Sequence, residues 1–219
     1  MIEKIELDVA NRGHITNSYL VYDKNNIGIL IDPAYNPKKI ISKIVELGIN
    51  IECIIITHAH ADHIGALEEV QKFTKARIFV FKDDFDSLIG KSKNYYDVLG
   101  VEKQNLDIST IKVLDAEETL KVGDNSFEII HTKGHTKGSI CIFYKEENVL
   151  FTGDTIFANC YGRCDLYGGS IKEMKESLKK IFSRFKDITI YPGHGASTNI
   201  EEAKKYIRLL FAINGDTLR

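Results

Sequence analysis

The sequence Thr57-His58-Ala59-His60-Ala61-Asp62-His63 directly follows the apolar run Cys53-Ile54-Ile55-Ile56, which is typical of a buried strand. It holds three of the seven histidines of the chain and one carboxylate. A single histidine is most often a surface or packed core residue. Buried imidazoles need partners, however, so a cluster of them at a strand end indicates a use. Histidine and carboxylate together form the ligand set of zinc and other divalent first-row metals.

Further candidate ligands come later in the chain, each beside a glycine: Gly134-His135-Thr136, Gly153-Asp154-Thr155 and Gly193-His194-Gly195. Asp154 and His194, like His58, follow apolar strand patterns. Because a strand end is rigid while the loop after it can present side chains, such residues can converge on one centre. The candidate metal ligands are His58, His60, Asp62, His63, His135, Asp154 and His194.

This set is larger than one tetrahedral metal ion needs. His58 and His60 are two residues apart, so in an extended segment they project to the same side. A carboxylate can bridge, which makes Asp154 the natural shared ligand of two ions. Two neighbouring ions can hold a hydroxide between them and lower the pKa of bound water toward about 7.

Composition narrows the class of protein. The 219 residues carry a formal net charge of −2, without a basic stripe that would indicate nucleic-acid binding. No apolar run is long enough to cross a bilayer, and Met1–Leu7 lacks the pattern of a signal peptide. We therefore expect a cytoplasmic protein that binds neither membrane nor nucleic acid, with its cysteines as thiols. The sequence carries no signal for the oligomeric state.

Strand and helix patterns alternate along the first half of the chain, which predicts an α/β arrangement. Asp62 has a second interpretation here, as the N-cap of a helix over Ile64–Thr74. His14 is expected on the surface, and His131 as a packing residue. The predicted elements are strands at 18–22, 27–31, 51–57 and 77–81, a helix from Pro37 with Asn36 as its N-cap and Gly48 as its end, and the helix that ends near Phe73.

The second half is richer in strands, at 119–122, 126–131, 139–144, 149–151 and 188–191. A helix begins after Ser170, whose hydroxyl can cap it, and another runs over 200–211. The first of these helices should bury Ile171, Met174, Leu178, Ile181 and Phe185, and the second Ala203, Tyr206, Ile207 and Leu210. No linker divides the halves, so we predict a single domain over residues 1–219, with two sheets face to face and helices outside.

Residues 83–110 interrupt the pattern. The segment is polar and carries Tyr95, Tyr96 and Leu99 without a clear period. It has two interpretations: a surface insertion, or a flap over the site, since loops on rigid scaffolds often contact substrate.

The motifs resemble the metallo-β-lactamase superfamily. The resemblance rests on Thr57–Gly65, His131–Ser139, Phe151–Thr155 and Pro192–Gly195, which together span most of the chain. Gly162-Arg163-Cys164-Asp165-Leu166 resembles the glyoxalase II-like branch and the related persulfide dioxygenases. The resemblance implies a four-layer αββα sandwich of two mixed β-sheets flanked by helices, an α/β (α+β) fold.

The same resemblance assigns roles to the candidate ligands. It implies one metal ion held by His58, His60, His135 and Asp154, and a second held by Asp62, His63, Asp154 and His194. Asp62 would also orient the hydroxide and is the candidate catalytic residue. Zinc is the expected metal, with iron or manganese as alternatives. The implied activity is hydrolysis of a small-molecule thioester, such as an S-acylglutathione, or of a related ester.

Other functions share these motifs. One alternative is a persulfide dioxygenase with a single iron ion held by two histidines and a carboxylate. A lactonase and a non-catalytic metal-holding scaffold are further alternatives. Cys164 stands where the family often has threonine. We also expect a chain that ends at Arg219 to be too short for the C-terminal helical region that full-length glyoxalase II enzymes use to hold glutathione.

Overall fold

The computed structural model describes residues 1–215, 217 and 218, and these residues form two six-stranded sheets. The strand order is β1-β2-β3-β4-β5-β6 in the first sheet and β12-β11-β10-β9-β8-β7 in the second. Both sheets are mixed: β3 to β6 run parallel, as do β10 and β11, and the other pairs are antiparallel. The strands are β1 (Ile2–Val9), β2 (His14–Tyr22), β3 (Ile27–Ile31), β4 (Asn50–Ile55), β5 (Arg77–Phe81), β6 (Ile111–Leu114), β7 (Thr119–Val122), β8 (Asn125–His131), β9 (Ile140–Tyr144), β10 (Val149–Gly153), β11 (Thr189–Pro192) and β12 (Thr198–Asn199).

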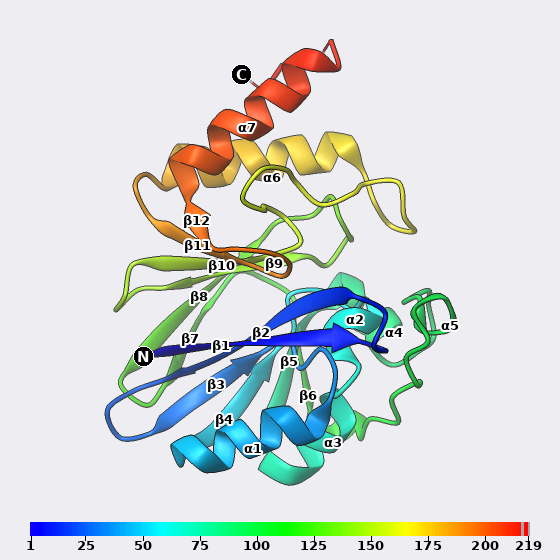
Figure 1. The fold of residues 1–219 in the computed structure, drawn as a ribbon, viewed down its shortest axis with the longest axis vertical. Helices are drawn as coiled ribbons and strands as arrows, with labels where there is room; N and C mark the ends of the chain where they lie inside the picture. The colour runs from blue at the N-terminus through cyan, green and yellow to red at the C-terminus, as the bar shows by residue number, and fades with distance from the viewer. Residues whose placement is uncertain (216, 219) are drawn as a thin grey trace.

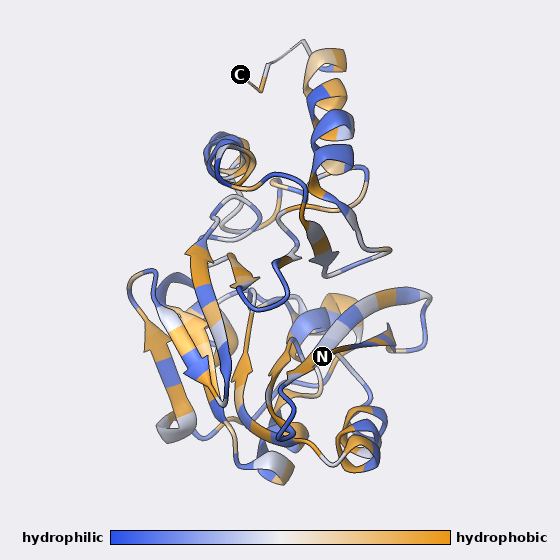
Figure 2. Ribbon diagram, turned by 90° about the vertical axis from the view of Figure 1, so that its left-hand side faces the viewer, coloured by the Kyte–Doolittle hydropathy of each residue, from blue (hydrophilic) through white to orange (hydrophobic). Residues whose placement is uncertain are grey.

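Helices cover the outer face of each sheet, which confirms the αββα sandwich (Figure 1). The first sheet is covered by α1 (Pro37–Leu47) and α3 (Leu67–Thr74), and the second by α6 (Ile171–Arg184) and α7 (Ile200–Ile213). The hydropathy of the ribbon follows these layers, with apolar strands inside and mixed helices outside (Figure 2). Among the described residues, none of the helices combines the length and the apolar character required to cross a membrane.

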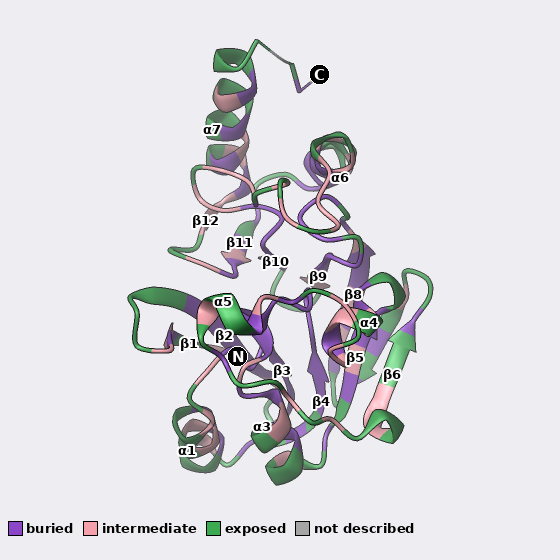
Figure 3. Cartoon of the chain, turned by 90° about the vertical axis from the view of Figure 1, so that its right-hand side faces the viewer, coloured by how far each residue is buried: buried purple, intermediate pink, exposed green. Residues whose placement is uncertain are grey.

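The period-2 alternation of the strands explains the layers. Ile54 faces α1 and α3 in one core cluster, whereas its neighbours Cys53 and Ile55 belong to the cluster between the sheets. In the second sheet, Ile129 lies between the sheets and Ile130 packs under α6 and α7. Neighbouring side chains therefore fill different cores, and central strands such as β3 and β10 are buried on both faces, whereas β6 and β7 also carry exposed residues (Figure 3).

The helix expected over Ile64–Thr74 is instead two helices, α2 (Ala61–Ile64) and α3. At the junction, the backbone N–H of Ala66 donates to the carbonyl of Pro33 at 2.9 Å, which diverts it from a continuous helix. The prediction of Asp62 as an N-cap is wrong, because Asp62 lies inside the first turn of α2 and His60 occupies the N-cap position.

Other helix predictions hold with small corrections. Asn36 caps α1, Gly48 ends it, and the Ser170 hydroxyl accepts from the backbone N–H of Glu173 at the start of α6. Ile171 and Tyr206 were expected in the core but are about half exposed, at 45% and 51%, because each lies at the margin of its apolar stripe. Strands β1, β6 and β12 were not among the predicted strands.

Residues 83–110 form short helical turns between β5 and β6: η1 (Lys82–Asp84) at the start, then α4 (Phe85–Leu88), α5 (Tyr96–Leu99) and η2 (Ile108–Thr110). Hydrogen bonds tie α5 on two sides. Arg12 donates to the carbonyl of Val98 at 3.4 Å, and the backbone N–H of Tyr167 donates to the hydroxyl of Tyr95 at 2.7 Å.

Two buried carboxylates fix the loops at the ends of the strands. Asp84 accepts from the backbone N–H groups of Ala59 and Gly138 and from the hydroxyl of Thr136, at 2.8–2.9 Å. It therefore links a loop of the first sheet to a loop of the second, and burial raises its pKa. Asp32 accepts from the backbone N–H and the hydroxyl of Thr57 at 2.7 and 2.6 Å.

We predict that Asp84→Asn lowers the free energy of unfolding by about 1–3 kcal/mol, because the new amide points an N–H group at one of three buried donors. Urea unfolding followed by circular dichroism would measure the change. Asp83→Asn, in the same turn but exposed, is the matched control and should be nearly neutral. Equal stability of both variants and the unchanged protein would refute a role for Asp84 in joining the loops.

Candidate metal centre

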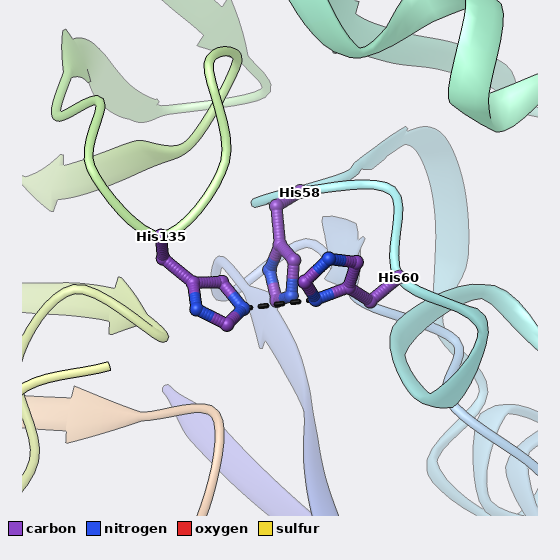
Figure 4. Close-up of side chains that lie close together, drawn as sticks. All are labelled: His58, His60 and His135. Atoms are coloured by element: carbon purple, nitrogen blue, oxygen red, sulfur yellow. Dashed lines mark hydrogen bonds between the residues drawn. The ribbon is translucent and has the colours of Figure 1, made fainter. Parts of the chain in front are cut away.

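All seven predicted ligands lie together at one end of the two sheets. The first sheet contributes the segment after β4 and the short helix α2, which carry His58, His60, Asp62 and His63. The second sheet contributes the loop between β8 and β9, the end of β10 and the loop after β11, which carry His135, Asp154 and His194. These segments meet along the seam between the two sheets. Figure 4 shows His58 and His60 on one side of the seam and His135 on the other, with the three rings pointing toward one another.

Asp154 lies between two groups of histidines. Its Oδ2 atom is 3.5 Å from His135 Nε2 and 3.4 Å from His194 Nε2, and its Oδ1 atom is 3.3 Å from His63 Nε2. On one side, His60 Nδ1 is 2.9 Å from His135 Nε2. On the other, His63 Nε2 is 3.3 Å from His194 Nε2. The carboxylate of Asp154 is therefore within reach of histidines from both groups.

Hydrogen bonds from behind fix several of the rings. His135 Nδ1 donates to the carbonyl of Arg163 at 2.8 Å, and His194 Nδ1 donates to the carbonyl of Ile15 at 2.7 Å. His63 Nδ1 is 2.8 Å from the carboxylate of Asp32. A carboxylate, like a carbonyl, accepts hydrogen bonds without donating them, so this nitrogen is also a donor. A neutral imidazole that donates from Nδ1 has its lone pair at Nε2. In their neutral form, the three rings would therefore aim Nε2 lone pairs into the centre, an arrangement that suits a cation.

Two buried atoms support the same conclusion. His58 Nε2 and Asp154 Oδ1 have no hydrogen-bond partner among the residues that the structure describes. A buried polar atom left unpaired costs about 1–3 kcal/mol, and a metal ion would satisfy both. The donor set of imidazole nitrogens and carboxylate oxygens fits zinc, iron or manganese.

The charge states of the rings differ between the two sides. Burial, with the neighbouring His135, lowers the pKa of His60 to about 3, and burial also holds the pKa of His58 well below its usual range. Burial acts in the same direction on His63 and His194, but nearby carboxylates, with Asp154 first, raise the pKa of these rings to about 10 and about 11. A cation bound on that side would take the place of those protons.

The ligand atoms form three groups that could each hold a metal ion. Within each group these atoms lie within 4.8 Å of one another, and the groups are His58, His60 and His135; His58, His63 and Asp154; and His14, Asp62 and His194. His14 in the third group is the exception to the sequence analysis. His14 is on the surface as expected, with its side chain 45% exposed, but the expectation did not include its contact with the centre: His14 Nε2 lies 2.7 Å from Asp62 Oδ2.

Sequence reasoning also missed the roles of Asp32 and Asp84. Each follows an apolar strand, β3 and β5, as do the ligands themselves, so the signal was present. No comparable signal marks His14, which lies at the start of β2 rather than after a strand.

A cavity of about 570 Å³ opens in front of the centre. His60, Asp62, His135, Asp154 and His194 form its floor. Its walls are largely apolar, with Tyr95, Val98, Leu99, Phe157 and Leu166 among the lining side chains. Arg163 also lines it, but its guanidinium makes two hydrogen bonds to Asp165, at 2.8 and 2.7 Å.

Comparisons with known proteins identify the family of this chain. Residues 11–194 match the family model described as the metallo-beta-lactamase superfamily. The chain is 29% identical to hydroxyacylglutathione hydrolase GloC of Haemophilus influenzae, over 86% of this chain and 90% of the relative. It is 35% identical to a probable metallo-hydrolase of Methanocaldococcus jannaschii, over 86% of this chain and 92% of the relative.

Solved structures give the same result. The crystal structure of the BLEG-1 B3 metallo-beta-lactamase superposes with a TM-score of 0.85 at 27% identity and covers 96% of this chain and 99% of that one. The structure of TTHA1623 in a di-iron-bound form superposes with a TM-score of 0.81 at 25% identity and covers 94% and 99%. With the model match over most of its length, this chain belongs to the metallo-β-lactamase superfamily.

Proposed function

We propose that this protein uses two divalent metal ions, zinc first among them, to hydrolyse a small-molecule thioester or a related ester. The observation that carries the proposal is the convergence of histidine Nε2 atoms on the buried carboxylate of Asp154, at 3.3–3.5 Å. Relatives named as a hydroxyacylglutathione hydrolase and as a probable zinc-dependent hydrolase of Bacillus subtilis support it.

The proposed ligands divide into two sets that share Asp154. One ion would be held by His58, His60, His135 and Asp154, and the other by Asp62, His63, Asp154 and His194. When bound, such ions lower the pKa of a water molecule and polarise a carbonyl oxygen. Asp154, buried between the two sets of histidines, would contribute a carboxylate oxygen to each set.

Asp62 is proposed as the residue that orients the attacking water. Its carboxylate lines the cavity, and its Oδ2 atom is 3.4 Å from His194 Nε2. Burial alone would raise its pKa, but His63 and hydrogen bonds from His14 and His194 hold that pKa well below its usual range. As a carboxylate, Asp62 can accept a hydrogen bond from water and direct the oxygen lone pair toward the substrate carbonyl.

The apolar walls of the cavity indicate where the acyl group lies. Val98 and Leu99 on α5 and Phe157 on the opposite side offer no charged group, and Arg163 is already paired with Asp165. We propose that the acyl chain of the substrate packs between these walls while its carbonyl faces the metal ions. Of the two interpretations of residues 83–110, a flap over the site and a surface insertion, this proposal favours the flap.

The first prediction from the proposed activity concerns the metal. Protein purified without added metal should hold two metal equivalents by elemental analysis, lose thioesterase activity with a chelator and regain it with zinc.

Asp62→Ala should lower kcat by about 10²–10⁴ because the water loses its orienting group. Asp115→Ala, an exposed control, should keep full turnover. Unchanged turnover in Asp62→Ala, or a single iron with oxygen uptake on glutathione persulfide, would overturn the proposal.

The second prediction concerns the acyl chain. Each added methylene should raise kcat/KM by about threefold to fourfold until the cavity is full, since burying one methylene contributes about 0.8 kcal/mol. A series of straight-chain acyl thioesters would measure the slope. Val98→Asp should flatten it, whereas Val45→Asp, at another exposed position, on α1, should not. A flat slope in the unchanged protein would show that the walls do not hold the acyl group.

A further inference from the structure

His14 makes the shortest polar contact to Asp62 among the neighbours of that carboxylate. The distance from His14 Nε2 to Asp62 Oδ2 is 2.7 Å, compared with 3.4 Å from His194 Nε2 and 4.0 Å from His63 Nε2. The His14 side chain is 45% exposed and lines the mouth of the cavity, whereas that of Asp62 is 9% exposed. A largely buried carboxylate is thus paired with a ring that reaches it from outside.

The backbone places His14 there. It is the first residue of β2, paired with Val9 of β1 at the end of the ladder. Gly13 in the preceding turn has φ +74°, and its N–H donates to Asp8 Oδ1 at 2.8 Å. A hydrogen bond within the turn therefore closes it, and the His14 ring is attached to a fixed part of the backbone.

The same strand end also holds His194. The carbonyl of Ile15 accepts from His194 Nδ1 at 2.7 Å, and the Asn17 side chain donates to the carbonyls of Pro192 and Gly195 at 2.9 Å. The rings of His14 and His194 lie 4.9 Å apart. One strand of the first sheet thus contacts two of the proposed ligands of the second ion.

Asp62 needs such support because of where it lies. It belongs to α2, a single helical turn, so the helix does little to fix its side chain. A carboxylate that binds a metal through one oxygen keeps its orientation when that group also accepts a hydrogen bond. His14 supplies that bond from the side open to the cavity.

We infer that His14 is a positioning residue, which donates a hydrogen bond from Nε2 to Asp62 Oδ2 and holds this carboxylate toward the second metal position. The inference rests on the proposed dinuclear site and adds a residue to it. His14 acts through Asp62 and is not itself a ligand, so a side chain with an N–H donor of similar reach can replace it.

The test compares His14→Phe, which removes the donor, with His14→Gln, which keeps an N–H donor. Zinc binding is measured by competition with a chromophoric chelator, and kcat and KM on an acyl thioester are measured alongside. His14→Phe should bind the first zinc normally and the second about 10- to 100-fold more weakly, with kcat reduced at saturating substrate. His14→Gln should recover most of the second-site affinity. His131→Gln, a histidine stacked on Phe81 outside the centre, is the control and should bind both ions normally.

The results distinguish the role of His14 from the existence of the dinuclear site. Failure of the unchanged protein to bind zinc would refute the dinuclear site itself. Two tight zinc ions in His14→Phe would refute the role of His14 while leaving that site intact. Equal weakness of His14→Gln and His14→Phe would make the ring a direct ligand and would refute positioning. Matching thermal unfolding of the zinc-free variants would show that the fold is unchanged.

Discussion

The structure depends on a crowded set of imidazole lone pairs and carboxylates held out of water. Several histidines donate from Nδ1 to a fixed acceptor behind them, and their other nitrogens face inward. Without a cation such an arrangement is costly, since His58 Nε2 has no hydrogen-bond partner among the described residues and two rings bind protons strongly. The acceptors behind the rings are what prevent the side chains from turning away.

Those acceptors come from both sheets, which explains why a sandwich suits this centre. Asp32 holds His63 from the first sheet, whereas the carbonyl of Arg163 holds His135 from the second. Asp84 and Asn17 then fix the two halves against each other with buried hydrogen bonds. The apolar cores fill the layers but have no directional preference, so these polar contacts set the register of one sheet against the other at the seam.

The sequence was most informative where local pattern and burial coincide. Period-2 alternation and strand-end loops were enough to predict most of the strands, the layers and the convergence of His58, Asp154 and His194. It was less informative where tertiary contacts decide. The break between α2 and α3 depends on a hydrogen bond to Pro33, and the contact of His14 with Asp62 depends on the way β2 begins. Neither leaves a periodic trace in the chain.

The seam between the sheets has a mechanical consequence. His60 and His135 are 75 residues apart in the chain, and their facing nitrogens come from different sheets. An ion held between them would close a long loop of the polypeptide, as a covalent cross-link does, and would favour the folded chain by RT ln(1 + [L]/Kd). The concentration of free metal would then set how stable the folded sandwich is, and with it the lifetime of the protein against proteolysis.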